Sequence, residues 1–295
     1  MTGCHVMAGL PVARWYDRGY FAQTMLHADL DDVTLGYEDV GSGPPIIWVH
    51  EYFGDHRSWG PQLTAFSRSY RNIVYDARGY PASSAPAEVE FYSQQAMVDD
   101  LDHLLDHLGI ERAVVAGLSM GGNVAVNYGM QHPERCLGLV VAGCGSGSTD
   151  RSGFEAKALS MLAVIAAEGM AGLHRWMESD PTRIPLKEKD PLGWEELGRR
   201  LADRSPEAAQ AVYRGVQLRR PGILTLGERL AATPVPTLVA FGDADSACVE
   251  PGLFMWRQLP NARLAVIPAS GHAINLEEPE LFNAVVRQFL GDLGL

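Results

Sequence analysis

The residues best suited to chemistry in this chain form the run Gly-Leu-Ser-Met-Gly at 117–121, which has the pattern Gly-x-Ser-x-Gly. An apolar stretch precedes this run, and a helical pattern follows it. A strand that passes through the motif directly into a helix turns so tightly that the serine hydroxyl projects from the backbone. Gly117 and Gly121 suit the turn because side chains there would clash across it. Ser119 is therefore predicted to be a nucleophile.

A serine hydroxyl is a weak nucleophile at neutral pH and needs a base, which in turn needs an acid to orient it. His272 follows the last apolar strand pattern, which predicts a loop at the same end of the sheet as Ser119. Asp245 comes three residues after the glycine that ends the strand pattern at 237–242 and is the preferred acid. Asp243 is the alternative. The order Ser, Asp, His along the chain agrees with the elbow motif.

Acyl chemistry at a serine also requires two backbone N–H groups that hold the negative charge on the attacked oxygen. Met120, directly after the serine, is expected to supply one of them. The other should come from the loop at 50–54, His-Glu-Tyr-Phe-Gly, which follows a buried strand pattern. Tyr52 is the favoured donor and Glu51 the alternative, whereas His50 is expected to be a packed, hydrogen-bonded residue.

Strand patterns alternate with helical patterns along most of the chain. Short apolar runs typical of buried parallel strands lie at 46–49, 72–75, 113–116, 137–142, 237–242 and 262–267. Helical spacing marks 93–108 and a closing segment near 279–290. This alternation predicts an α/β fold, with a mostly parallel central sheet and helices on both faces.

The segment from about residue 147 to 232 has helical patterns and no convincing strand. It predicts a helical cap inserted before the last two strands, over the carboxyl ends of the strands, where open α/β sheets bind ligands. The predicted organisation is an N-terminal extension at 1–28, a core formed by 29–146 and 233–295, and the cap at 147–232.

The composition and charge of the chain limit the kinds of partner that it can bind. The chain has 295 residues, 46% hydrophobic and 20% charged, which is typical of a globular protein. Its net charge of -12 leaves no basic face for nucleic acid. The four cysteines lack Cys-x-x-Cys spacing, and no export signal or apolar run of membrane-spanning length is evident. We expect a cytoplasmic protein without a membrane partner; a homo-oligomer is compatible with the sequence.

Taken together, these motifs resemble the α/β-hydrolase fold superfamily, in the group with a helical cap that includes lipases, esterases, lactonases and C–C hydrolases. The resemblance covers residues 33–291 and rests on 117–121, on 50–54 with Trp59, on Asp-Ala-Arg-Gly-Tyr-Pro at 76–81, on 242–245 and on Gly271-His272. It implies a catalytic triad of Ser119, Asp245 and His272. It also implies an oxyanion hole from Tyr52 and Met120, and no need for a metal or an organic cofactor.

Glu51 departs from this family pattern, which usually has glycine at that position. Its carboxylate is predicted to contact the substrate, with a solvent-facing position as the alternative. Trp176 and Trp194, together with Met161 and Met177, belong to the apolar side chains of the cap. They favour a small, fairly apolar substrate, and packing of the cap on the core is the alternative role of each.

The function implied by the resemblance is hydrolysis of a carboxylic ester or lactone through an acyl-enzyme on Ser119. Three alternatives use the same fold. They are hydrolysis of a C–C bond in a β-diketone-like compound, acyl transfer or perhydrolysis with the same triad, and a non-catalytic binding role. The expected partner is a small-molecule ester or ketone, and its identity depends on the shape of the pocket.

Overall fold

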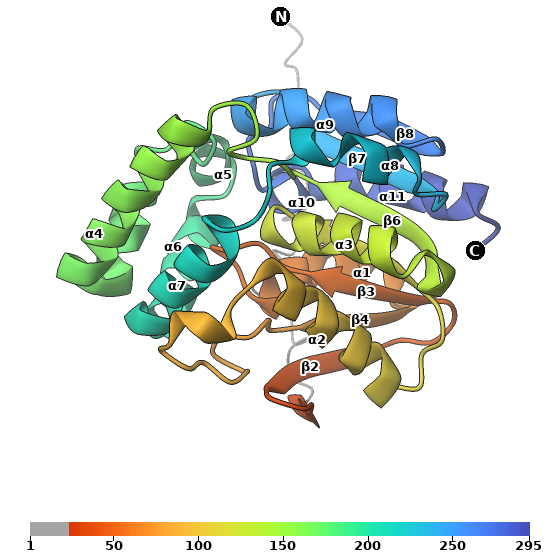
Figure 1. Cartoon of the computed structure of the whole chain (residues 1–295), viewed down its shortest axis with the longest axis horizontal. Helices are drawn as coiled ribbons and strands as arrows, with labels where there is room; N and C mark the ends of the chain where they lie inside the picture. Colours follow the sequence, from red (N-terminus) through yellow and green to blue (C-terminus); the bar gives the residue numbers. More distant parts are fainter. Residues whose placement is uncertain (1–23) are drawn as a thin grey trace, which may run out of the picture.

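The computed structural model describes residues 24–295, and its centre is an eight-stranded sheet (Figure 1). The strand order is β1-β2-β4-β3-β5-β6-β7-β8. The strands span Leu26–Asp29 (β1), Thr34–Val40 (β2), Pro45–Val49 (β3), Arg71–Tyr75 (β4), Ala113–Leu118 (β5), Cys136–Ala142 (β6), Thr237–Gly242 (β7) and Ala262–Ile267 (β8). The β1–β2 and β2–β4 pairs are antiparallel, and all the other pairs are parallel. The mostly parallel sheet confirms the predicted fold class.

Helices cover both faces of this sheet. One face carries α1 (Gly60–Phe66), α10 (Ile274–Glu277) and α11 (Pro279–Asp292), and the other carries α2 (Gln94–His107), α3 (Met120–Gln131) and α9 (Ser246–Gln258). Along β5, Val114 and Ala116 pack into one apolar cluster, whereas Ala113 and Val115 pack into the other. A strand buried on both faces must be apolar at every position, which explains the continuous apolar runs in the sequence.

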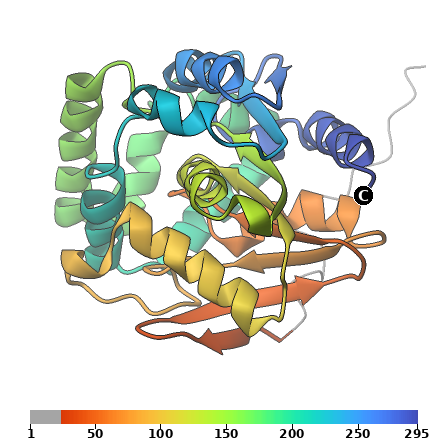
Figure 2. The same ribbon diagram turned by 45° about the vertical axis from the view of Figure 1, so that its right-hand side comes forward.

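The chain between β6 and β7 forms the predicted helical cap. It contains α4 (Arg151–Met177), α5 (Ile184–Lys189), α6 (Pro191–Ala202), α7 (Pro206–Val212) and α8 (Gly227–Ala231). Figures 1 and 2 show α4, α6 and α7 gathered beside the sheet. The last helix, α8, instead packs against α9 of the core. Short turns of helix complete the structure at His56–Trp59 (η2), Val89–Phe91 (η3), Pro133–Arg135 (η4), Tyr213–Gln217 (η5, a π-helix) and Ile223–Leu226 (η6).

Helix α4 is long and apolar enough to meet the length and composition of a membrane span. The sequence was expected to contain no apolar run of this length. Gly169 has φ 65° and ψ −159°, however, so the helix is interrupted at this residue. The helix packs on α6 and α7, and side chains on its inward side, such as Met161 and Ile165, are buried. The buried apolar residues of α4 thus contribute to the packing of the cap.

The predicted N-terminal extension at 1–28 lies mostly outside the described residues. Its end differs from the prediction, because Leu26–Asp29 forms β1 and pairs with β2 at the edge of the sheet. Only Ala28 of these four residues is buried. An edge strand with one buried side chain has no apolar alternation, so the sequence carried no signal for it.

Candidate active site

Ser119 occupies the turn between β5 and α3 and has φ 56° and ψ −107°. Its positive φ lies in a region that residues other than glycine rarely adopt, so tight packing must hold it there. A Cβ at Gly117 would press against the backbone of Gly121, and a Cβ at Gly121 would press against the Val49 carbonyl. The Ser119 N–H donates to the Ala142 carbonyl at 2.8 Å. The predicted elbow geometry is therefore present, and Ser119 lies at a cavity.

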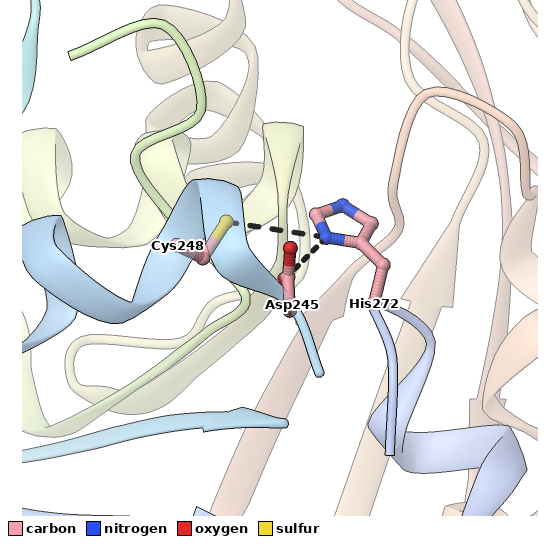
Figure 3. A group of neighbouring side chains, drawn as sticks. All are labelled: Asp245, Cys248 and His272. Carbon is pink, nitrogen blue, oxygen red and sulfur yellow. Dashed lines mark hydrogen bonds and ion pairs between the residues drawn. The ribbon is translucent and has the colours of Figure 1, made fainter. Parts of the chain in front are cut away.

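The structure brings His272 and Asp245 together from the loops after β8 and β7 (Figure 3). The His272 Nδ1 atom lies 2.6 Å from Asp245 Oδ2. Both residues line the same cavity as Ser119. Asp243, the alternative acid, instead accepts a hydrogen bond from the Ser270 N–H at 3.1 Å. The geometry therefore selects Asp245 as the partner of the histidine.

Burial and charge act in opposite directions on this pair. Burial favours neutral His272, but the Asp245 carboxylate outweighs it, and the pKa of His272 is raised. Burial likewise disfavours the Asp245 carboxylate, but His272 outweighs it and the pKa of Asp245 is lowered. With its Nδ1–H bound to Asp245, His272 presents Nε2 as the atom that can accept a proton.

Cys248 lies beside the pair, and nothing in the sequence pattern indicated it. Its Sγ is 4.0 Å from His272 Nδ1 (Figure 3). The same Sγ is 3.3 Å from Ser146 Oγ. Burial raises the pKa of the Cys248 thiol well above its ordinary value, so the thiol stays protonated at neutral pH. Asp245, Cys248 and His272 are metal-ligand types in one group. The imidazole of that group is already bonded to a carboxylate.

A second group of metal-ligand types, Asp55, His56 and Asp76, lies elsewhere in the core. His56 Nδ1 is 2.7 Å from Asp76 Oδ1, and Asp55 accepts hydrogen bonds from Arg57. The His56–Asp76 bond and the Asp55–Arg57 pair give these side chains a structural role.

The predicted oxyanion hole lies where the loop after β3 meets the start of α3. Neither the Tyr52 N–H nor the Met120 N–H donates to another of the described residues. The Ala77 N–H donates to His50 Nε2 at 3.0 Å, so the His50 Nδ1–H donates to the Glu51 carbonyl at 2.7 Å. His50 thus has the structural role expected of it, and it holds the loop that carries Tyr52.

The cap also holds this loop. The Tyr52 carbonyl accepts hydrogen bonds from the Tyr80 hydroxyl at 2.8 Å and from Arg204 Nη1 at 2.9 Å. Arg204 comes from the end of the α6 region and lies over the Tyr80 ring, 3.7 Å from its centroid. The loop that carries the Tyr52 N–H is therefore fixed by contacts with both the core and the cap.

Glu51 departs from its predicted substrate contact. Its carboxylate forms a two-pronged ion pair with Arg183 of the cap, with Arg183 Nη1 at 2.7 Å from Glu51 Oε1. Both side chains are buried, and Arg183 also lies over the Phe53 ring at 4.8 Å. A planar guanidinium matches a carboxylate in this way and offsets the cost of burying it. The residue that replaces the family glycine therefore joins the cap to the core.

The cavity under the cap has a volume of about 360 Å³. Trp176 and Met161 line it, together with Phe53, Phe154 and Tyr213. Trp194 does not line it. Its buried ring packs against His174 with 4.9 Å between the ring centroids. Met177 is likewise buried in the apolar core and absent from the lining. The lining is more polar than the apolar residues of the cap predicted, because it also includes Lys157, Asp180, Gln217 and Arg220.

Comparison of the chain with known proteins shows which family it belongs to. A family profile described as alpha/beta hydrolase fold matches residues 44–279. The chain therefore belongs to the α/β-hydrolase family, as its motifs predicted. It is 29% identical over 251 residues to 3-oxoadipate enol-lactonase 1 of Acinetobacter baylyi, which covers 84% of this chain and 89% of that one.

Solved structures agree with this assignment. A hydrolase from Pseudomonas aeruginosa superposes with a TM-score of 0.81 at 27% identity, covering 92% of this chain and 99% of the other. A thermophilic esterase from Thermogutta terrifontis superposes with a TM-score of 0.79, at the same identity and coverage. The similar proteins are hydrolases of several kinds, and this chain is a hydrolase of the same fold.

Proposed function

We propose that this protein hydrolyses a carboxylic ester or lactone through an acyl-enzyme on Ser119. The observation that carries the proposal is that the strained Ser119 lines the same cavity as the His272–Asp245 pair, in which His272 Nδ1 lies 2.6 Å from Asp245 Oδ2. The similarity to an enol-lactonase and to an esterase agrees with this reaction class.

In the proposed mechanism, Ser119 Oγ attacks the carbonyl carbon while His272 Nε2 takes the hydroxyl proton. The Tyr52 and Met120 N–H groups stabilise the negative oxygen of the tetrahedral intermediate. The charged imidazole, held by Asp245, then gives its proton to the departing alkoxide. Water attacks the acyl-enzyme with His272 again as base, and this step releases the acid and restores the Ser119 hydroxyl.

The test is hydrolysis of p-nitrophenyl acetate, butyrate and octanoate by the wild type and by Ser119→Ala. Removal of the nucleophile should lower kcat by about a thousandfold or more. Thermal unfolding of both proteins checks that the variant keeps its fold. If the well-folded wild type turns over no ester, the proposal fails, and a β-diketone becomes the next substrate to assay.

A further inference from the structure

Arg220 differs from the other charged residues of the cavity because none of the carboxylates that the structure describes forms an ion pair with it. Lys157 Nζ pairs with Asp180 Oδ2 at 2.9 Å, and Arg183 pairs with Glu51. Of the remaining acids, Asp245 binds His272, and Asp150 caps the first turn of α4. Within the described part of the chain, Arg220 forms no ion pair.

The contacts of Arg220 are with neutral acceptors. Its Nε donates to Gln217 Oε1 at 3.0 Å, its Nη1 to Asn123 Oδ1 at 3.1 Å and its Nη2 to the Ser146 carbonyl at 2.9 Å. A guanidinium has five N–H donors, and these contacts use three of them. Each terminal nitrogen of Arg220 therefore keeps one N–H that donates to none of these acceptors. The residue is 6% exposed, and burial lowers its pKa without making the guanidinium neutral. A buried charge without a counter-ion is costly unless a ligand supplies one.

Gln217 gives the second, independent observation. Its Oε1 is fixed as the acceptor from Arg220, which identifies Nε2 as the amide donor. This Nε2 is buried without a hydrogen-bond partner among the described residues, and the whole residue is 5% exposed. Gln217 ends the π-helical turn η5, an irregularity that often occurs at functional sites. Arg220 and Gln217 both line the cavity.

The two side chains lie close to the nucleophile in the structure. Asn123, which accepts from Arg220, is one helical turn after Ser119, and its N–H donates to the Ser119 carbonyl at 3.0 Å. Ser146, Ser119 and Arg220 line the same cavity. A small molecule in that cavity can therefore reach the candidate nucleophile and the unpaired guanidinium together.

We propose that Arg220 and Gln217 form a subsite for a carboxylate carried by the substrate. The free N–H groups of Arg220 and the Nε2 donor of Gln217 supply the hydrogen bonds that a carboxylate accepts. The preferred substrate is then a small ester or lactone that also carries a carboxylate. This inference rests on the proposed esterase function for its kinetic readout.

The test compares two esters of matched shape, the p-nitrophenyl half ester of glutarate and p-nitrophenyl 5-methylhexanoate. The acyl chain of the first ester ends in a carboxylate, and that of the second ends in an isopropyl group. The wild type should have the higher kcat/KM for the glutarate ester. In Gln217→Glu, the new carboxylate has the same shape as the amide that it replaces and pairs with Arg220. The ratio of kcat/KM for the glutarate ester to kcat/KM for the methylhexanoate ester should therefore fall about tenfold or more.

Arg220→Met removes the charge itself and should lower the same ratio. Arg219→Met is the matched control, because Arg219 is the exposed neighbour and its loss makes the same change in net charge. The control should keep the wild-type ratio. A ratio that is unchanged in Gln217→Glu and in a folded Arg220→Met overturns the proposal. If Arg220→Met does not fold, Gln217→Glu decides the question.

A binding measurement separates this inference from the proposed reaction. Calorimetric titration with glutarate should show binding to the wild type and weaker binding to Gln217→Glu. If neither ester is hydrolysed but this difference in binding is found, the esterase proposal fails and the carboxylate subsite stands. If glutarate does not bind and the wild type hydrolyses both esters equally well, the subsite is wrong and the esterase proposal stands.

Discussion

His272 is a buried histidine whose Nδ1 is bound to a carboxylate and whose Nε2 is the base of the proposed mechanism. Nδ1 is bound to Asp245, and the residue's own N–H donates to the Thr182 carbonyl of the cap at 2.9 Å. Burial alone would lower the pKa of His272, and the nearby carboxylate reverses that effect. The balance of these two effects decides the pH at which the base becomes available.

The raised pKa of His272 predicts the acid limb of the pH–rate profile. A general base must be neutral, so kcat/KM should fall as pH decreases through the His272 pKa, which lies above the ordinary value of about 6.5. Asp245→Asn removes the carboxylate charge, so the limb should move to lower pH and kcat should drop about ten-thousandfold. Kinetics on p-nitrophenyl butyrate between pH 5 and 9, with circular dichroism at each pH, checks this. A wild-type limb at or below the ordinary value would contradict it.

At the scale of elements, the segment between α4 and α5 joins the cap to two core loops, the loop that carries His272 and the loop that carries Glu51 and Tyr52. The Thr182 carbonyl accepts the hydrogen bond from the His272 N–H, and the adjacent Arg183 forms the ion pair with Glu51. Gly271 is also close to this segment, because a Cβ there would press against the Thr182 carbonyl. A disturbance of the cap segment should therefore reach the chemistry.

Removing one partner of the buried Glu51–Arg183 pair should destabilise the fold strongly. Glu51→Ala leaves the guanidinium buried without a counter-ion and should cost about 3–5 kcal/mol in urea unfolding. The double variant Glu51→Ala/Arg183→Met should recover part of this loss, because it removes both charges. Lys187→Met is the control, since its pair with Glu178 is exposed and should contribute about 0–1 kcal/mol. Equal losses for Glu51→Ala and the control would contradict a structural role for the pair.

At the scale of the whole molecule, polar contacts join the cap to the core at several separate points. Arg204 binds the Tyr52 carbonyl, Arg220 binds Asn123, and Lys189 reaches the Ala269 carbonyl at 2.7 Å. The main apolar cluster also includes residues of both parts, such as Tyr52 of the core and Val212 of the cap. The cap is therefore packed as part of one structure.

These contacts predict that cap and core unfold in a single thermal transition. Differential scanning calorimetry should give one peak, with a calorimetric enthalpy close to the van't Hoff enthalpy. Far-ultraviolet circular dichroism and tryptophan fluorescence should report the same midpoint, since tryptophans lie in both parts, at Trp48 and Trp59 in the core and at Trp176 and Trp194 in the cap. Two resolved peaks, or two midpoints, would show that the cap unfolds independently.

Much of this molecule could be predicted from the sequence because the features concerned are local. The glycines around Ser119 determine the tight turn, the apolar runs determine the buried strands, and the ends of parallel strands must meet at one edge of the sheet. These rules placed Ser119, Asp245 and His272 at one site and the cap over it. They depend on neighbouring residues and on regular periods, which a sequence displays directly.

The tertiary structure alone decided which side chains meet across long stretches of chain. Glu51 and Arg183 are 132 residues apart in sequence, and the pattern could not show that the cap would supply a counter-ion to Glu51. In the same way, Trp194 faces His174 rather than the cavity, and Arg220 has no acid partner among residues 24–295. Such contacts depend on the path of the cap helices in space. That path is set by packing over many residues, and no local pattern records it.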